Sequence, residues 1–151
     1  PPRPSGSPLL DTFMIFRVLW VGLVLAGGVF WLHQTTLAAS QDPARASTVA
    51  LNLLVMGELV YLFNCRRWQG FALSPNTLFS NPWAWWMALI LVGLQLGVTY
   101  LPPAQALFGT VSLPLAAWGP ILGLSLALFA LVELEKWLTR RLRLDWARPG
   151  H

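Results

Sequence analysis

Four long apolar segments, separated by short polar links, restrict what this chain can fold into. A helix that crosses the hydrocarbon core of a bilayer needs about 20 mostly apolar residues, because each residue adds about 1.5 Å to a path of about 30 Å. The segments that qualify are 13–32, 47–65, 83–101 and 117–134. The sequence therefore predicts four transmembrane helices.

The composition agrees with a membrane environment. Hydrophobic residues make up 56% of the 151 positions and charged residues only 11%, whereas soluble domains average about 25% charged. The charges collect at the ends of the apolar segments, as a bilayer requires. We interpret the net charge of +4 as a topology signal and predict no nucleic-acid partner. The lone Cys65 excludes an internal disulfide and a thiolate metal cluster, since both need further cysteines.

The links between the segments define the expected architecture. Residues 33–46, 66–82 and 102–116 contain the Pro, Gly, Asn and Ser residues at which helices end and chains turn. Short links favour neighbouring helices that run in opposite directions and pack together. The predicted fold is all-α, an integral membrane bundle of four antiparallel transmembrane helices with short loops.

The basic residues predict the orientation of this bundle. Nine of the ten Lys and Arg residues fall on one side of the predicted helices, and Arg45 is alone on the other side. The nine are Arg3, Arg17, Arg66, Arg67, Lys136, Arg140, Arg141, Arg143 and Arg148. The positive-inside rule places both termini and the middle link in the cytoplasm.

Glu58 is the acidic residue that lies deep within an apolar segment, and it is the main candidate for chemistry. A charge in the bilayer interior costs about 2.5 to 3.5 kcal/mol on insertion scales, so such a carboxylate normally faces a bundle interior and marks an ion or proton path. Tyr61 is the nearest polar neighbour on its helical face, and Asn64 lies to one side. The alternative is a carboxyl that only ties helices together. Since Ca²⁺ takes six to eight oxygen ligands, most ligands of any ion at Glu58 would come from elsewhere.

Catalytic motifs are missing from the sequence. It contains no GxxxxGK[ST] phosphate-binding loop, no GxSxG and no HExxH. The charged group at the end of the last segment, Glu133, Glu135 and Lys136, is interpreted as an interfacial ion-pair cluster, with Glu133 and Lys136 paired at i, i+3. We therefore predict no catalytic site and no bound cofactor in this chain alone.

Five motifs are spread along the chain from Pro1 to about Arg143. They are PPRPSGSPLL, ASTVALNLLVMGELVYLFNCRRW, LFSNPWAWW, VTYLPPAQALFGTVSLPLAAW and LVELEKWLTRR. Taken in order, they resemble the last four transmembrane helices of type II P-type cation-transporting ATPases, above all the calcium-pump-like bacterial members and the sarco/endoplasmic reticulum calcium pump.

This resemblance implies a role for each candidate residue. Glu58 matches the glutamate that calcium pumps use as an ion ligand on their eighth membrane helix, and Asn64 matches a following asparagine. Tyr61 departs from the pattern, which has an amide there, so Tyr61 and Asn64 are expected only as neighbours of the ion path. Sodium/potassium pumps carry glutamine where Glu58 stands, which favours the calcium-like branch.

The resemblance also implies a setting. Residues 1–143 would form the C-terminal membrane domain and residues 144–151 a cytoplasmic tail. The domain would contact the bilayer and the upstream helices and cytoplasmic domains of an ATP-hydrolysing translocase, which would bind Mg-ATP and the transported cation. A bacterial plasma membrane is the expected location. The chain begins with Pro1 and has no signal-peptide pattern, so we expect it to continue a longer protein.

Two other functions fit the same residues. An independent four-helix membrane scaffold or accessory subunit would use Glu58 as a tie between helices. A small oligomeric channel for cations or protons would place several copies of Glu58 around a pore.

Overall fold

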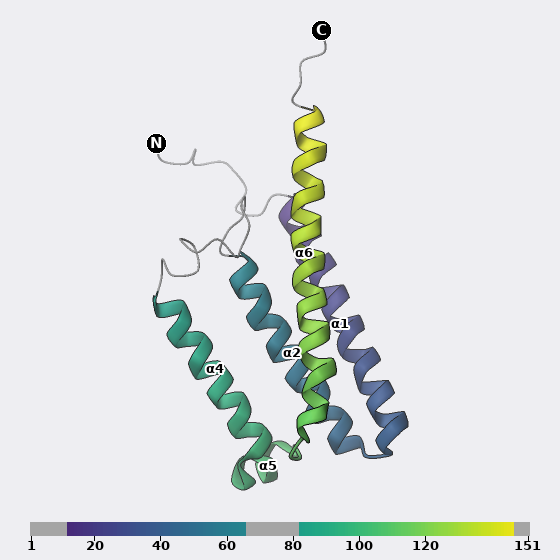
Figure 1. Ribbon diagram of the computed structural model, residues 1–151, viewed down its shortest axis with the longest axis vertical. Coiled ribbons are helices and arrows are strands. Elements are labelled where there is room, and N and C mark those ends of the chain that lie inside the picture. The colour runs from purple at the N-terminus through teal and green to yellow at the C-terminus, as the bar shows by residue number, and fades with distance from the viewer. Residues whose placement is uncertain (1–11, 66–81, 147–151) are drawn as a thin grey trace.

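The structure is a computed structural model that describes residues 12–65 and 82–146. Within these ranges the regular elements are all helical. They are α1 Thr12–Ser40, α2 Pro43–Cys65, α4 Pro82–Tyr100, α5 Pro102–Phe108, the short 3₁₀ helix η1 Leu115–Ala117, and α6 Trp118–Trp146 (Figure 1). The basic pair Arg66 and Arg67, the N-terminal motif and the end of the predicted tail lie outside the described residues.

Three of the helices are long and apolar enough to cross a bilayer. They comprise Ile15–Ser40, Pro43–Asn64 and Leu115–Leu138. A fourth crossing is obtained when Trp85–Tyr100 and Pro102–Phe108, which meet at an angle of 83°, are taken together as one broken span. The chain is thus a helical, multi-pass membrane protein with three to four candidate spans.

The predicted link 33–46 is mostly wrong, because α1 continues to Ser40 and α2 begins at Pro43. Only Gln41 and Asp42 join them. In the sequence, the hydroxyl residues of this segment indicate a turn. In the structure they donate to carbonyls of their own helix, as Ser40 Oγ does to the carbonyl of Thr36 at 2.8 Å. Gln41 then adopts a left-handed conformation with φ 55°, and Asp42 Oδ1 accepts from the backbone amides of the first turn of α2. The chain reverses direction within two residues.

The predicted link 102–116 also contains an unpredicted helix. Pro102 and Pro103 occupy the first positions of α5, where the missing amide hydrogens of proline cost nothing. The helix ends at Gly109, whose φ of 65° is a conformation that glycine adopts without strain. The link is therefore a compact helical turn at the end of α4.

A three-helix core of α1, α2 and α6 carries most of the packing. Two clusters of buried aliphatic side chains fill it, one around Leu53 and Ile121 and one around Leu25, Leu128 and Val132. Figure 1 shows α6, green to yellow, alongside α1 and α2, with α4 standing to one side next to α2. Contacts join α4 to α2 near the middle of α2, through Asn52, and in its last turn, through Phe63, so α4 flanks the core without entering it.

The outer surfaces of the helices are strongly apolar. Leu19, Leu23 and Phe30 of α1 and Leu89 and Leu94 of α4 each leave more than half of their surface exposed. Bilayer lipid, rather than water, is the solvent that tolerates such a surface.

Candidate functional site

Glu58 lies on the outward side of α2. Its side chain is exposed, and Leu54 and Leu62, one turn to either side, are exposed with 40% and 48% of their surface. The adjacent Gly57 is buried instead: a Cβ atom there would lie 2.5 Å from a methyl of Leu25. Thus α2 turns its glycine toward the three-helix core and its carboxylate away from it.

Tyr61 and Asn64, unlike Glu58, contact the three-helix core. Tyr61 is half-buried and packs against the cluster that contains Leu25 and Val132. Asn64 is only 1% exposed and donates from Nδ2 to Oε1 of Glu133 at 3.1 Å. The structure therefore does not gather the three sequence candidates around one point, and Glu58 stands separately.

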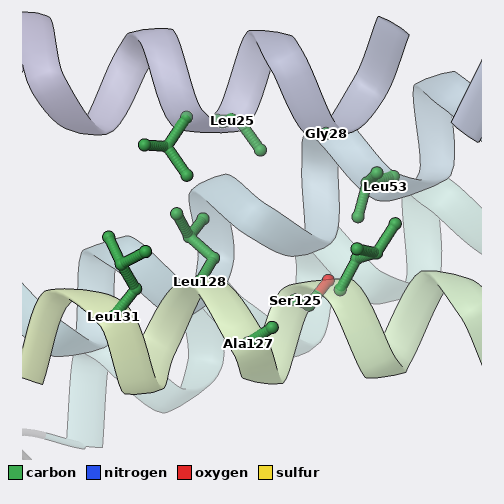
Figure 2. A pocket seen from close by; sticks show the side chains of 9 residues that line it. Leu25, Gly28, Leu53, Ser125, Ala127, Leu128 and Leu131 are labelled. Carbon is green, nitrogen blue, oxygen red and sulfur yellow. The ribbon is translucent and has the colours of Figure 1, made fainter. Parts of the chain in front are cut away.

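The interior of the three-helix core holds a cavity with a volume of about 140 Å³. Figure 2 shows Leu25 of α1 and Leu128 of α6 directed toward one another across it, with Leu53 of α2 at one side. The hydroxyl of Ser125, also in the wall, already donates to the carbonyl of Ile121 at 2.8 Å. Apart from this one hydroxyl oxygen, the wall is apolar and offers a cation far fewer than the six to eight oxygens that Ca²⁺ takes.

A charged network joins the three core helices at the end where α1 begins and α2 finishes. Arg17 of α1 lies 3.1 Å from Glu135 of α6, with side chains 5% and 20% exposed. Lys136 Nζ lies 2.8 Å from Glu133 Oε1 and also donates to the backbone carbonyl of Asn64 at 2.9 Å. Lys136 therefore neutralises a buried carboxylate and caps the last turn of α2.

The sequence predicted one part of this network and missed the other. The i, i+3 pair of Glu133 and Lys136 is confirmed. The link between Arg17 and Glu135 was missed, because Arg17 was read only as a topology signal. An Arg inside an apolar segment needs an acidic partner. Because Glu133 already pairs with Lys136, Glu135 was the remaining acid in that group that could pair with Arg17.

The other end of the molecule is joined by neutral groups. Asn52 Nδ2 of α2 donates to Thr99 Oγ1 of α4 at 3.1 Å, and Thr99 Oγ1 donates to the carbonyl of Gln95 at 2.8 Å. The amide of Val111, in the link before α6, donates to Thr48 Oγ1 of α2 at 3.0 Å. These bonds attach α4 and the following link to the first half of α2.

Aromatic side chains extend this neutral cluster. Tyr100 donates from its hydroxyl to the carbonyl of Leu113 at 2.9 Å and accepts from the indole nitrogen of Trp118 at 2.8 Å. Gln105 of α5 donates to both the Thr99 carbonyl and the Ser112 hydroxyl. The bent α4–α5 pair is thereby fixed against the beginning of α6.

These features define a helical membrane module that has an apolar core, polar networks in both halves and a carboxylate, Glu58, that faces outward. A family model described as "Cation transporting ATPase, C-terminus" matches residues 1–138. The chain belongs to this family, and its resemblance to the C-terminal membrane domain of P-type cation-transporting ATPases is confirmed.

Curated relatives include "Probable cation-transporting ATPase F" of Mycobacterium tuberculosis, which is 31% identical over 146 residues, covering 93% of this chain and 15% of that protein. "Calcium-transporting ATPase type 2C member 2" of Mus musculus is 30% identical over 145 residues, with coverage of 93% and 15%. "Calcium-transporting ATPase" of Bacillus subtilis is 34% identical over 93 residues, or 56% of this chain and 9% of that protein. The chain thus spans a small part of the length of these relatives.

Proposed function

We propose that this chain is the membrane-embedded support domain of an ATP-driven cation pump and that Glu58 supplies one oxygen ligand to the transported cation. The observation that carries this proposal is the outward position of Glu58 on α2. The core side of α2 is filled by α1 and α6, and the cavity there is apolar. A carboxylate directed away from that core is available to helices that are not part of this chain.

The remaining ligands of the cation are assigned to those other helices. Within residues 12–65 and 82–146, no three acidic, His or Cys side chains come together as a metal site. One carboxylate is too few for a hard cation such as Ca²⁺, which takes six to eight oxygens. Mg-ATP and the phosphorylated group belong, in this proposal, to the cytoplasmic domains of the same pump.

The proposed topology has four antiparallel spans, with both termini in the cytoplasm of a bacterium. Arg17, Lys136 and Arg141 lie toward the end of the core at which α2 finishes, whereas Arg45 lies at the hairpin end. Under the positive-inside rule the first end is cytoplasmic. Residues 1–143 then form the membrane domain and residues 144–151 a cytoplasmic tail.

Calcium or a similar divalent cation is the proposed substrate. The names of two relatives above refer to calcium transport, and a carboxylate is the side-chain ligand that hard cations prefer.

The test is ion-dependent formation of the phosphoenzyme by the pump that contains this chain. Glu58→Gln keeps the size of the side chain and one carbonyl oxygen but removes the charge. We expect the ion concentration for half-maximal phosphorylation to rise by about tenfold or more, because Ca²⁺ affinity depends on the number of charged ligands.

Asp42→Asn is the matched control. It makes the same carboxylate-to-amide change at the hairpin, where asparagine caps a helix as well as aspartate does. The control should titrate like the wild type. Identical titrations for wild type and Glu58→Gln would remove the ligand role and favour a carboxyl that only ties helices together.

A further inference from the structure

A second cavity, separate from Glu58, opens where α1, α2 and α6 meet at the hairpin end. Its volume is about 420 Å³, within the range of about 300 to 1,000 Å³ that is typical of ligand pockets. Trp31 and Leu32 of α1, Val49 of α2 and Pro120 of α6 provide apolar walls, and Arg45 of α2 supplies a positive charge. The cavity is therefore largely apolar with a single cation in its wall.

The Arg45 guanidinium is available to a ligand. Its side chain makes no ion pair or hydrogen bond with the described part of the chain. The nearby carboxylate of Asp42 does not line the cavity, and its Oδ1 accepts from the backbone amides of Ala44 and Arg45. No other Lys or Arg lies at this end within the described residues, since Arg17, Lys136 and Arg141 are at the other end.

Of the three hydroxyl groups in the wall, those of Thr35 and Ser40 already donate within α1, and that of Thr36 carries no charge. Thr35 donates to the carbonyls of Trp31 and Leu32, and Ser40 donates to the carbonyl of Thr36. Their protons are thus used within α1. Arg45, with its five N–H donors in a planar fork, is the group that sets the charge of the ligand.

An anion that also carries apolar chains matches this wall. A guanidinium binds the two oxygens of a phosphate in a bidentate manner, while the apolar walls disfavour a small hydrated anion. The cavity lies at the ends of spanning helices, the depth at which lipid phosphates occur. We propose that this cavity binds a glycerophospholipid, with its phosphate on Arg45 and an acyl chain along Trp31, Leu32 and Val49. This site does not depend on the role of Glu58.

Native mass spectrometry of the full 151-residue chain in detergent micelles tests the proposal. Dioleoylphosphatidylglycerol should remain bound to the wild type. Arg45→Gln should lower its affinity by about tenfold or more, the loss expected for charge-assisted hydrogen bonds. Arg141→Gln removes the same charge at the other end, where the guanidinium lies 4.5 Å from the Trp137 ring, and should retain the lipid.

Three further measurements separate the contribution of the phosphate from the contribution of the acyl chains. Ala39→Trp fills the cavity while leaving Arg45 in place, and it should also release the lipid. Dioleoylglycerol, which has the same chains without phosphate, should bind at least tenfold more weakly by the same argument. Inorganic phosphate in excess should not displace the lipid.

Each outcome decides the proposal. Retention of phosphatidylglycerol by Arg45→Gln or Ala39→Trp, at wild-type helicity in circular dichroism, would overturn it. If dioleoylglycerol bound as tightly as dioleoylphosphatidylglycerol, the cavity would be a site for apolar chains alone and the role of Arg45 would be refuted. Displacement by inorganic phosphate would show a site for the free anion instead.

Discussion

The two ends of the molecule are held together by different chemistry. Where α2 finishes, buried charges join the helices, with Lys136 placed between Glu133 and the backbone of Asn64. In the half of α2 that follows the hairpin, neutral amides and hydroxyls join the helices instead, as in the bond between Asn52 and Thr99. Removal of one member of a buried ion pair leaves an uncompensated charge, whereas removal of one neutral group leaves an unpaired but uncharged polar group, which costs less. The charged end should therefore be much more sensitive to single substitutions.

The largest effect is expected for Lys136→Met. The side chain of Lys136 is 2% exposed, so methionine fills a similar volume but leaves the Glu133 carboxylate buried and unpaired. We expect a loss of about 3 to 5 kcal/mol in the free energy of unfolding. Reversible unfolding in mixed detergent–SDS micelles, followed by circular dichroism, measures it.

The control for this prediction is the double variant Lys136→Met with Glu133→Leu. Replacement of both charges by apolar groups should recover most of the lost stability. A loss below about 1 kcal/mol for Lys136→Met alone, the size typical of an exposed pair, would contradict the buried network.

A smaller effect is expected for Asn52→Leu at the neutral end. Asn52 is completely buried, but Thr99 keeps its bond to the Gln95 carbonyl at 2.8 Å when the amide is lost. We therefore expect a loss of about 1 kcal/mol, within the range of about 0.6 to 2 kcal/mol for hydrogen bonds between membrane helices. The same unfolding assay applies.

Thr99→Val provides the matched variant on α4. Because both substitutions remove the same bond, their effects should not add in the double variant. A loss for Asn52→Leu that equals the loss for Lys136→Met would remove the contrast between the two ends.

The smallest effect is expected for Tyr100→Phe. The Tyr100 ring is 40% exposed, and only the hydroxyl that joins Trp118 to Leu113 is removed. We expect a loss of about 0.5 to 1 kcal/mol, measured in the same way. Trp118→Phe removes one of these bonds together with part of an indole that packs against the cluster around Leu53 and Ile121, so it should cost more than Tyr100→Phe. A smaller loss for Trp118→Phe would show that the shared hydroxyl is not the source of stability.

The sequence predicted the helices better than their ends. Apolar length alone located the four helical segments, because a bilayer demands about 20 apolar residues in a row. It placed the end of the first helix at residue 32, eight residues before Ser40, because Thr35 and Ser40 resemble turn residues although their hydroxyls bond within the helix. The short helix after Pro102 was missed for a similar reason, since its two prolines start a helix as readily as they end one.

Contacts between distant segments were the least predictable part of the candidate site. The pairing of Glu133 with Lys136 follows from helical spacing alone. The pairing of Arg17 with Glu135 depends on how α1 and α6 align, which local sequence does not encode. Likewise, the pattern of α2 identified Glu58 as unusual, but only the packing of Gly57 against Leu25 showed which side of α2 faces the core.

The two-residue connection between α1 and α2 has a consequence for how this chain is oriented in a membrane. Only Gln41 and Asp42 lie between the two helices. Because this connection is too short to span the bilayer, the orientation of α1 in the membrane fixes the orientation of α2. Orientation of the hairpin is therefore a single binary choice. Basic residues near the start of α1 and near the end of α2 act on that one choice together, so a substitution that weakens either group leaves the other to preserve the same sidedness.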